Sequence, residues 1–400
     1  MRKTVLILLI AVIPFLGQAQ DQQSPFYSGK KTADIVLGPW LQAVTEDSFT
    51  VVWTTNWDAV GWVELAPDDG SHFFECDRPK YYEMKCGKKT VGKLHKVTVS
   101  GLTKGTTYRY RILNQSVITA PDDKRLVFGI TSGNDPFRLK PYTVTTRDSE
   151  AESCDFMIVN DIHANDSVFR ALVGNVIAEK QDFVVFNGDM VSAMDNEDML
   201  FNGYLRSANE LFAHNIPFYY NRGNHEGRGL FSYHFLDYFP TSTGETWFMV
   251  RQGPCAIIFL DCGEDKPETD DSYFGLDCSD NLRTREAAWL EQAVKTKDYV
   301  DAPVKIVVMH APPQPKGGWH VNAEIREKIM PILEKADVDL MLSGHIHRYE
   351  FNEAGKRASF PVLINKTNER HCFHVTAEGI QAKRMDASGK VIETYEFKEK

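Results

Sequence analysis

Apolar and polar residues alternate along the first part of the chain, from residue 33 to about residue 128. Phe49, Val51 and Trp53 fall on one face of such a segment, and a period of two is typical of a half-buried β-strand. Further strands of this kind are predicted at residues 61–65, 96–99 and 107–112. The pattern therefore predicts an all-β region over residues 33–128.

The pattern changes after residues 130–150, a polar stretch with prolines and threonines that we interpret as a connector. Short continuous apolar runs follow, at residues 156–159, 183–186, 257–260, 306–309 and 340–342. Helical patterns separate them, at residues 167–180, 283–297 and 322–336. Continuous apolar strands between helices are typical of buried strands in a layered α/β domain. Alternation returns over residues 361–397 and predicts antiparallel strands at a sheet edge.

Residues 1–19 have the pattern of a secretory signal peptide. Arg2 and Lys3 precede the apolar run 5–16, and Gly17 and Ala19 supply the small residues that signal peptidase needs. The run is shorter than the ~20 apolar residues that a membrane anchor needs, and no later stretch could span a membrane. No Cys stands directly after the predicted cleavage site, which argues against a lipoprotein. We therefore expect cleavage after Ala19 and export, to the periplasm or by secretion.

Size and charge narrow the class of protein. The 400 residues exceed the size at which one core usually stops growing, which agrees with two domains. The composition, 42% hydrophobic and 25% charged, is that of an ordinary globular protein. A formal net charge of −10 argues against nucleic acid or an anionic membrane as the main partner. A small anionic substrate remains compatible, because bound metal ions can make a site locally positive.

The chain has seven cysteines, so at least one thiol is unpaired within it. Export would permit disulfides, and Cys76 with Cys86 or Cys262 with Cys278 could close short loops. Buried apolar thiols are the alternative. The sequence leaves both open.

Polar residues follow five apolar strands at the points where the strands end. The motifs are Asn160-Asp161-Ile162-His163, Asn187-Gly188-Asp189, Asn221-Arg222-Gly223-Asn224-His225-Glu226, His310 and Ser343-Gly344-His345-Ile346-His347. The carboxyl ends of strands in an open α/β sheet form the edge where ligands bind. Burying so many polar groups together is costly unless a partner satisfies them. Mixed imidazole and carboxylate ligands suit Zn, Mn or Fe, and seven of them suit two metals that share a carboxylate.

The order Asp-x-His, Gly-Asp, Gly-Asn-His-Glu, His and Gly-His-x-His over residues 161–347 resembles the calcineurin-like metallophosphoesterase superfamily. The strand-rich region in front makes the chain resemble the purple acid phosphatase branch. That region itself resembles a fibronectin type III sandwich. In that fold a Tyr hydrogen-bonds back to the turn before its strand, and the strand with Tyr108 and Tyr110 would supply this Tyr here. The resemblance implies an α-β-β-α double-sheet metallophosphoesterase domain over residues 150–400.

The resemblance also implies a role for each motif residue. Asp189 would bridge two metal ions, which could be Mn, Fe or Zn. One ion would also bind Asp161, His163 and His347, and the other would bind Asn224, His310 and His345. His225 would donate to the phosphoryl group or the leaving oxygen without binding a metal. The implied reaction is hydrolysis of a small phosphate ester by a hydroxide that bridges the metals.

One departure from the purple acid phosphatase pattern concerns the metal site. That branch places a Tyr three residues after the bridging Asp, where this chain has Ser192, and it lacks the His of the first motif, which is His163 here. The site therefore resembles the general metallophosphoesterase kind, and we expect no ferric–tyrosinate colour.

Five further residues are candidate substrate contacts: Asn165, Arg222, Trp319, His320 and Arg348. Either Arg could grip a phosphate, or could be solvated or salt-bridged. Trp319 and His320 end a loop rich in Pro and Gly, and an aromatic ring there could stack on a leaving group. Glu226 either orients a neighbouring His or caps its own turn.

Three functions fit these observations. The first is an exported phosphomonoesterase, and the second is a phosphodiesterase or nucleotide pyrophosphatase with the same metals. The third is a binding protein whose site has decayed, which conflicts with the presence of all seven expected ligands and His225. The motifs do not separate the first two, because the loops 264–280 and 311–320 would shape the rim of the site.

Overall fold

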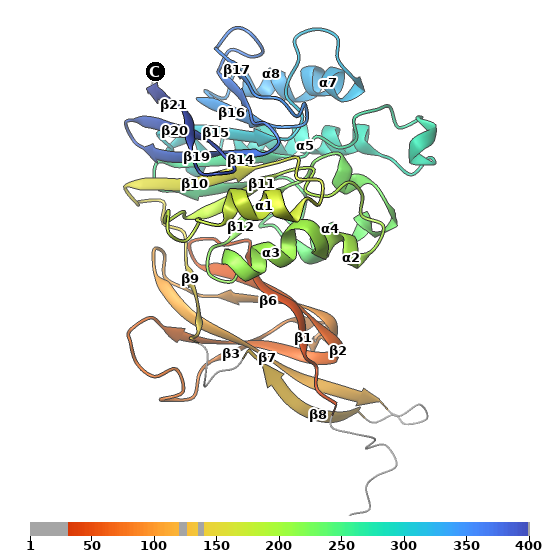
Figure 1. Ribbon diagram of the computed structural model, residues 1–400, viewed down its shortest axis with the longest axis vertical. Helices are drawn as coiled ribbons and strands as arrows, with labels where there is room; N and C mark the ends of the chain where they lie inside the picture. The colour runs from red at the N-terminus through yellow and green to blue at the C-terminus, as the bar shows by residue number, and fades with distance from the viewer. Residues whose placement is uncertain (1–30, 120–125, 135–139, 399–400) are drawn as a thin grey trace, which may run out of the picture.

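The computed structural model describes residues 31–119, 126–134 and 140–398 of the chain. The predicted signal peptide, residues 1–19, lies outside the described residues. In Figure 1 a strand-rich N-terminal region lies below a larger body that holds the helices and the remaining strands. Within the described ranges, no helix is both long and apolar enough to cross a membrane.

The N-terminal region is built around one long strand, β2 (Ser48–Pro67). The first half of β2 pairs with β1 and β6, and the second half pairs with β3 and β7. Strands β8 and β9 then pair with β7, and a separate ribbon is formed by β4 and β5. The bounds are β1 (Ile35–Gln42), β3 (Lys80–Tyr82), β4 (Met84–Lys85), β5 (Lys88–Lys89), β6 (Gly92–Ser100), β7 (Thr107–Thr119), β8 (Leu126–Gly133) and β9 (Tyr142–Thr145).

The strands predicted at residues 49–54 and 61–65 are the two halves of β2, separated by an irregularity in its pairing with β6. Trp53 from the first half and Val63 from the second half share one apolar core. The Tyr108 hydroxyl accepts a hydrogen bond from the Thr103 backbone N–H at 3.0 Å, so a Tyr bonds back to the preceding turn. The region is strand-rich as predicted, and its fibronectin type III class stays a prediction.

Part of the predicted connector is strand. Strand β8 continues to Gly133, and β9 pairs with β7, because Val144 of β9 is buried in the N-terminal core. The Thr residues around Val144 made this short strand resemble a polar connector. The N-terminal sheet therefore extends past the boundary at residue 128 that the sequence suggested.

The larger body contains two six-stranded sheets. The first has the order β12 (Phe218–Asn221), β11 (Phe183–Asn187), β10 (Ser153–Val159), β19 (Glu369–Thr376), β20 (Gly379–Asp386) and β21 (Val391–Lys398). The second has the order β13 (Phe248–Gln252), β14 (Cys255–Leu260), β15 (Val304–Met309), β16 (Leu340–Ser343), β18 (Val362–Ile364) and β17 (Glu350–Asn352). Strands β10–β12 and β14–β16 run parallel, and β19–β21 extend the first sheet with antiparallel strands.

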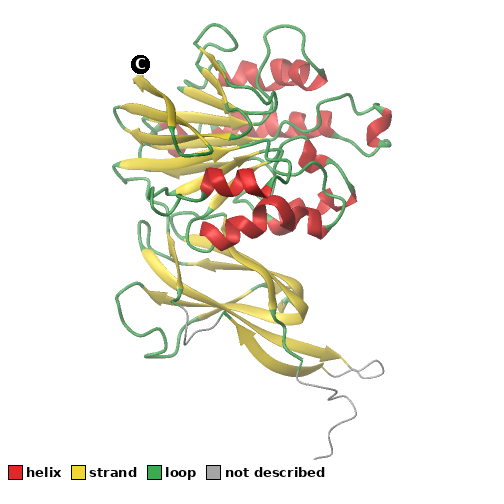
Figure 2. Cartoon of the chain, in the orientation of Figure 1, coloured by secondary structure: helices red, strands yellow, loops and turns green. Residues whose placement is uncertain are grey.

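Helices cover the outer faces of both sheets, as Figure 2 shows for the face nearest the viewer. Helices α1 (Asp166–Val173), α2 (Glu197–Leu200), α3 (Arg206–Ala208) and α4 (Phe235–Tyr238) cover the first sheet. The second sheet is packed against α5 (Ser279–Ala293), α6 (Lys297–Val300), α7 (His320–Glu324) and α8 (Met330–Leu333). Phe156 and Val308 lie in the apolar core between the sheets. These layers are the α/β arrangement that the apolar runs predicted.

The N-terminal region packs on the helix layer of the first sheet. Leu37 and Trp40 of β1 belong to the same apolar core as Phe235 and Tyr238 of α4. The buried Trp40 Nε1 donates to the Tyr238 carbonyl at 3.0 Å. The two regions therefore share a packed interface.

All seven cysteines are free thiols in this structure. The pairings that the spacing allowed, Cys76 with Cys86 and Cys262 with Cys278, are not formed. Cys154, Cys255 and Cys262 are buried, which agrees with the alternative of buried apolar thiols.

Candidate metal centre

The predicted ligands lie just beyond the carboxyl ends of five parallel strands. Strands β10, β11 and β12 of the first sheet lead to Asp161 and His163, to Asp189, and to Asn224 and His225. Strands β15 and β16 of the second sheet lead to His310 and to His345 and His347. Because parallel strands end at one edge, the two sheets bring these side chains together.

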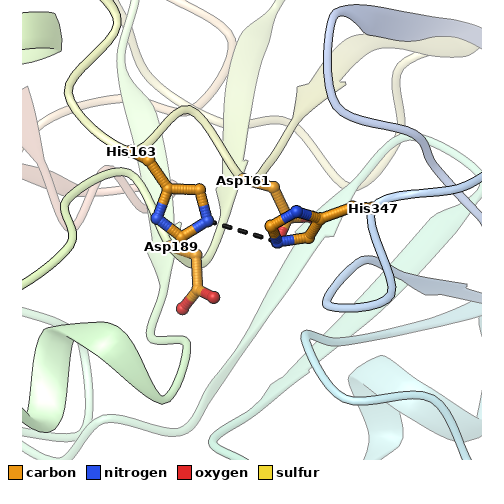
Figure 3. A group of neighbouring side chains, drawn as sticks. All are labelled: Asp161, His163, Asp189 and His347. Atoms are coloured by element: carbon orange, nitrogen blue, oxygen red, sulfur yellow. Dashed lines mark hydrogen bonds and ion pairs between the residues drawn. The ribbon is translucent and has the colours of Figure 1, made fainter.

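The first group of ligand atoms comes from Asp161, His163, Asp189 and His347, and these atoms all lie within 4.8 Å of one another. Figure 3 shows the His163 and His347 rings side by side, with the Asp189 carboxylate below them. The Nε2 atoms of His163 and His347 are 3.2 Å apart, and His347 Nε2 is 3.1 Å from Asp161 Oδ1.

The second group comes from Asp189, His310 and His345, again within 4.8 Å. His310 Nε2 lies 3.1 Å from Asp189 Oδ2. The Asn224 Oδ1 atom is 3.1 Å from His345 Nδ1, so this amide joins the group. Asp189 is common to both groups.

The charge at these groups fits a bound cation. Asp161 Oδ1 and His310 Nε2 are buried, and their contacts with His347 and Asp189 at 3.1 Å lack hydrogen-bond geometry. Burial opposes a charged His310, but the carboxylates of Asp189 and Asp161 raise its pKa to about 10. Burial likewise opposes a charged Asp189, but His310 holds the pKa of that carboxyl well below its usual range. Two buried carboxylates are therefore stabilised by nearby positive charge, which metal ions held by these imidazoles and carboxylates would supply.

The backbone at the strand ends is strained. Asp161, His163, Asp189, His345 and His347 all have φ between 47° and 70°. Such left-handed conformations are uncommon for residues other than glycine and cluster where function requires a fixed geometry. A Cβ on Gly223 would lie 2.4 Å from Asp189 Oδ1, and one on Gly188 would lie 2.5 Å from His310 Nδ1. These two glycines therefore let the chain close around the shared carboxylate.

Glu226 supports the loop that carries Asp189. Its buried carboxylate accepts hydrogen bonds from the backbone N–H groups of Asp189, Met190 and Gly223 at 2.8–2.9 Å. The Tyr220 hydroxyl also donates to it at 2.8 Å. Of the two roles considered for Glu226, the structure favours bracing of turns and shows no bond to an imidazole.

A buried chain of polar residues behind Asp161 was missed by the sequence analysis. The Asn160 side-chain amide donates to Asp161 Oδ2 and accepts from Asn365. The Asn365 Oδ1 atom in turn pairs with His371 Nδ1 at 2.8 Å. Asn160 stood in the first motif, but Asn365, which donates to it, is 205 residues away, so no local signal pointed to that contact.

His225 stands beside the centre and outside both groups. Its Nδ1 pairs with the Ser192 carbonyl at 2.7 Å, and its Nε2 is 3.8 Å from Asp189 Oδ2. Arg228, also missed, places a guanidinium nitrogen 3.1 Å from His225 Nε2. Arg228 is held from its other side by Glu264 and Asp265.

A cavity of about 1550 Å³ opens from the centre. Of the predicted substrate contacts, Arg222, Trp319 and Arg348 line it. Arg222 is paired with buried Asp261 at 2.7 Å, and exposed Arg348 pairs with Glu350 at 2.8 Å. Asn165 and His320 do not line it. The Asn165 side chain caps helix α1, and His320 pairs with Asp280 at 2.8 Å, so local bonds occupy both.

A third cluster with metal-ligand chemistry, formed by Asp280, His320 and Glu324, lies at the start of α5 and on α7. Arg283 pairs with Asp280, and Lys328 pairs with Glu324. Because these cations already neutralise the carboxylates, the cluster is a set of ion pairs.

Residues 155–349 match the family of calcineurin-like phosphoesterases. Purple acid phosphatase 22 of Arabidopsis thaliana is 25% identical over 304 residues, which cover 70% of this chain and 58% of that protein. Purple acid phosphatase 5 of the same plant is 23% identical over 349 residues, which cover 85% of this chain and 73% of that protein. The match thus spans little more than half of the first relative.

A solved structure of GAP50, described as the anchor in the inner membrane complex of Plasmodium, covers 62% of this chain and 90% of its own. Its TM-score is 0.42 at 17% identity. Residues 155–349 therefore form a calcineurin-like phosphoesterase domain, and the chain is similar to purple acid phosphatases.

Proposed function

We propose that this protein is a metal-dependent hydrolase of phosphate monoesters. One observation carries the proposal: two groups of ligand atoms share a single carboxylate, that of Asp189. Asp161, His163 and His347 would hold one metal ion with Asp189, and Asn224, His310 and His345 would hold the other. When bound, two such ions neutralise phosphoryl oxygens and lower the pKa of a bound water.

The residues around the ligands have separate tasks in this proposal. His310 Nδ1 pairs with the Asn187 carbonyl at 2.7 Å, which fixes its tautomer and leaves Nε2 for a metal. The Nδ1–H of His225 donates to the Ser192 carbonyl, so the ring can pass a proton to the leaving oxygen from Nε2 only in its doubly protonated form. Arg228 contacts His225 and is itself held by Glu264 and Asp265, so it restrains the His225 ring.

Hydrolysis of two model esters tests the proposal. Purified protein is stripped of metal, then loaded with Mn, Zn or Fe, and assayed with p-nitrophenyl phosphate and bis-p-nitrophenyl phosphate. We expect metal-dependent turnover of the monoester that Asp189→Asn abolishes. Asp155→Asn is the matched control, because Asp155 pairs with His374 on the same sheet and lies outside both ligand groups.

Other results would change the assignment. Preference for the diester would favour the phosphodiesterase or nucleotide pyrophosphatase alternative. Absence of both turnover and metal binding would overturn the enzyme assignment and leave the binding protein. The Ser192 position predicts that the iron-loaded protein lacks a tyrosinate absorption band.

Two further proposals concern the N-terminal part of the chain. We propose that residues 1–19 direct export to the periplasm or by secretion, which sequencing of the N-terminus of the mature protein tests. We also propose that the region up to β9 is a fibronectin type III-like spacer. The bond between Tyr108 and Thr103 supports that class.

A further inference from the structure

The wall of the cavity beside the metal centre carries exposed apolar side chains. Leu230, Tyr233, Phe274, Leu276 and Trp319 are all exposed and all line it. Among the described residues, five large aromatic side chains are exposed, and three of these lie in this one cavity. Exposed apolar residues gathered beside a polar centre mark a surface that binds a ligand.

Phe274 ends a short helical turn and is not buried. Its side chain is 85% exposed, and its backbone has φ of 53°. This left-handed conformation terminates the turn Asp271–Tyr273, where the Phe274 N–H donates to the Asp271 carbonyl at 3.2 Å. Tyr273 holds the turn in place, because its buried hydroxyl donates to Asp265 at 2.9 Å and accepts from the Lys266 N–H at 3.2 Å. The loop is therefore anchored at Tyr273 and presents Phe274 to the cavity.

Trp319 connects the apolar wall to the metal centre. Its ring meets the His345 imidazole edge to face, with ring centroids 5.1 Å apart, while the side chain remains 58% exposed. The Trp319 N–H donates to Asn322 Oδ1 at 2.8 Å, and the Asn322 amide donates to the Pro312 carbonyl at 3.1 Å. The loop thus holds an exposed indole next to a predicted ligand.

Asp189, Asn224 and His225 of the metal centre line the same cavity. Arg222 and Arg228 also line it, but each is already paired with a carboxylate. A ligand whose phosphoryl group lies at the metal centre and that also reaches the apolar wall has an anionic group at one end and an apolar group at the other. The apolar end meets three aromatic rings, and stacking favours an aromatic partner over an aliphatic one of equal size.

We infer that the cavity selects phosphate monoesters whose leaving group carries an aromatic ring, with Trp319 and Phe274 as the stacking surfaces. This inference rests on the proposed function, because it places the phosphoryl group at the metal centre. It adds the chemical class of the leaving group.

Binding of three non-hydrolysable phosphonates tests the inference without turnover. Benzylphosphonate, cyclohexylmethylphosphonate and methylphosphonate are titrated by calorimetry into the Mn-loaded protein. We expect benzylphosphonate to bind about tenfold more tightly than methylphosphonate, and more tightly than the cyclohexyl compound of similar size. Equal affinities would overturn the inference, and equal benzyl and cyclohexyl affinities would replace the aromatic leaving group by any apolar one.

Two variants test whether Trp319 and Phe274 produce the preference for the benzyl compound. Trp319→Ala and Phe274→Ala should each lower the ratio of benzyl to methyl affinity by about threefold to tenfold. Phe128→Ala is the matched control, because Phe128 is an exposed aromatic residue of β8 that does not line the cavity. A ratio unchanged in both cavity variants would overturn the assignment.

Hydrolysis separates failure of the inference from failure of the proposed function. Benzyl phosphate and ethyl phosphate have leaving alcohols of similar acidity. The ratio of their kcat/KM values therefore measures the contacts of the leaving group with the cavity. Turnover of both esters at equal kcat/KM would contradict the inference and keep the proposed function. Selective phosphonate binding without turnover of any ester would keep the selectivity of the cavity and contradict the proposed function.

Discussion

His95 of the N-terminal region and His310 of the larger body are both buried, but their surroundings differ. The His95 ring stacks on Trp53 and its Nε2 pairs with the Thr55 hydroxyl at 3.0 Å. Burial lowers the pKa of His95 to about 4. His310 faces the carboxylates of Asp189 and Asp161, which raise its pKa to about 10 despite its burial.

The comparison teaches how a structural histidine differs from a ligand. A neutral imidazole among neutral groups needs no partner beyond packing and one hydrogen bond. An imidazole that faces two buried carboxylates belongs to a site with excess negative charge, which a cation relieves. Burial alone distinguishes nothing, and the charge that the ring faces decides its role.

The largest expected effect separates the two histidines by mutation. His310→Ala should lower kcat/KM for a phosphate monoester by more than ~100-fold, because loss of a ligand costs more than loss of a residue that orients one. His95→Ala should leave kcat/KM unchanged and lower the free energy of unfolding by ~2 kcal/mol, through a cavity beside Trp53. Equal losses of activity in the two variants would contradict the assignment of His310 as a ligand and His95 as a structural residue.

Two buried asparagines extend the comparison to residues that support the groups around each site. Asn160 bonds to Asp161, and Asn114 accepts from Trp53 Nε1 at 2.7 Å in the N-terminal core. Asn160→Ala should weaken metal binding by about 10–100-fold, measured by competition with a chelator. Asn114→Ala should leave metal affinity as it is and lower the free energy of unfolding by about 1–3 kcal/mol. Unaltered metal affinity in the Asn160 variant would contradict the positioning role.

The pH dependence of stability should carry the signature of His95. Its folded pKa of about 4 lies below the unfolded value of 6.5, so its neutral form stabilises the fold above pH 6.5. That contribution is lost as the pH falls from 6.5 towards 4. At pH 5 the loss in the free energy of unfolding is about 2 kcal/mol. Urea unfolding at pH 7 and pH 5 measures it. His95→Gln should reduce the difference between the two pH values, and an identical difference in the variant would refute the assignment.

The smallest expected effect compares two arginines. Arg228→Lys should lower kcat/KM by about fivefold, because the guanidinium contacts His225 and the two carboxylates through different nitrogens, which a single ammonium nitrogen does not reproduce. Arg109 is an equally networked arginine of the N-terminal region, bonded to Pro67, Ser71 and Asp69. Arg109→Lys should leave kcat/KM unchanged. A similar loss in both variants would point to a general effect on folding.

Helices and supporting contacts were harder to predict than strands and motifs. The helix expected over residues 167–180 ends at Val173, and the one expected from Arg283 begins at Ser279. Helix limits depend on caps and tertiary packing, which periodicity does not contain. Asn165 looked like a rim residue because it follows the first motif, but its side chain caps α1.

The sequence by itself determined which residues could bind metal and that they lie at strand ends. Apolar runs of strand length predict buried strands from local composition, and the motif types specify the ligand atoms. The tertiary structure alone decided that Asn365 supports Asp161 through Asn160, and that Glu264 and Asp265 hold Arg228 beside His225. These contacts join segments that meet only when two sheets pack face to face, so their geometry follows from the whole fold and from no local pattern.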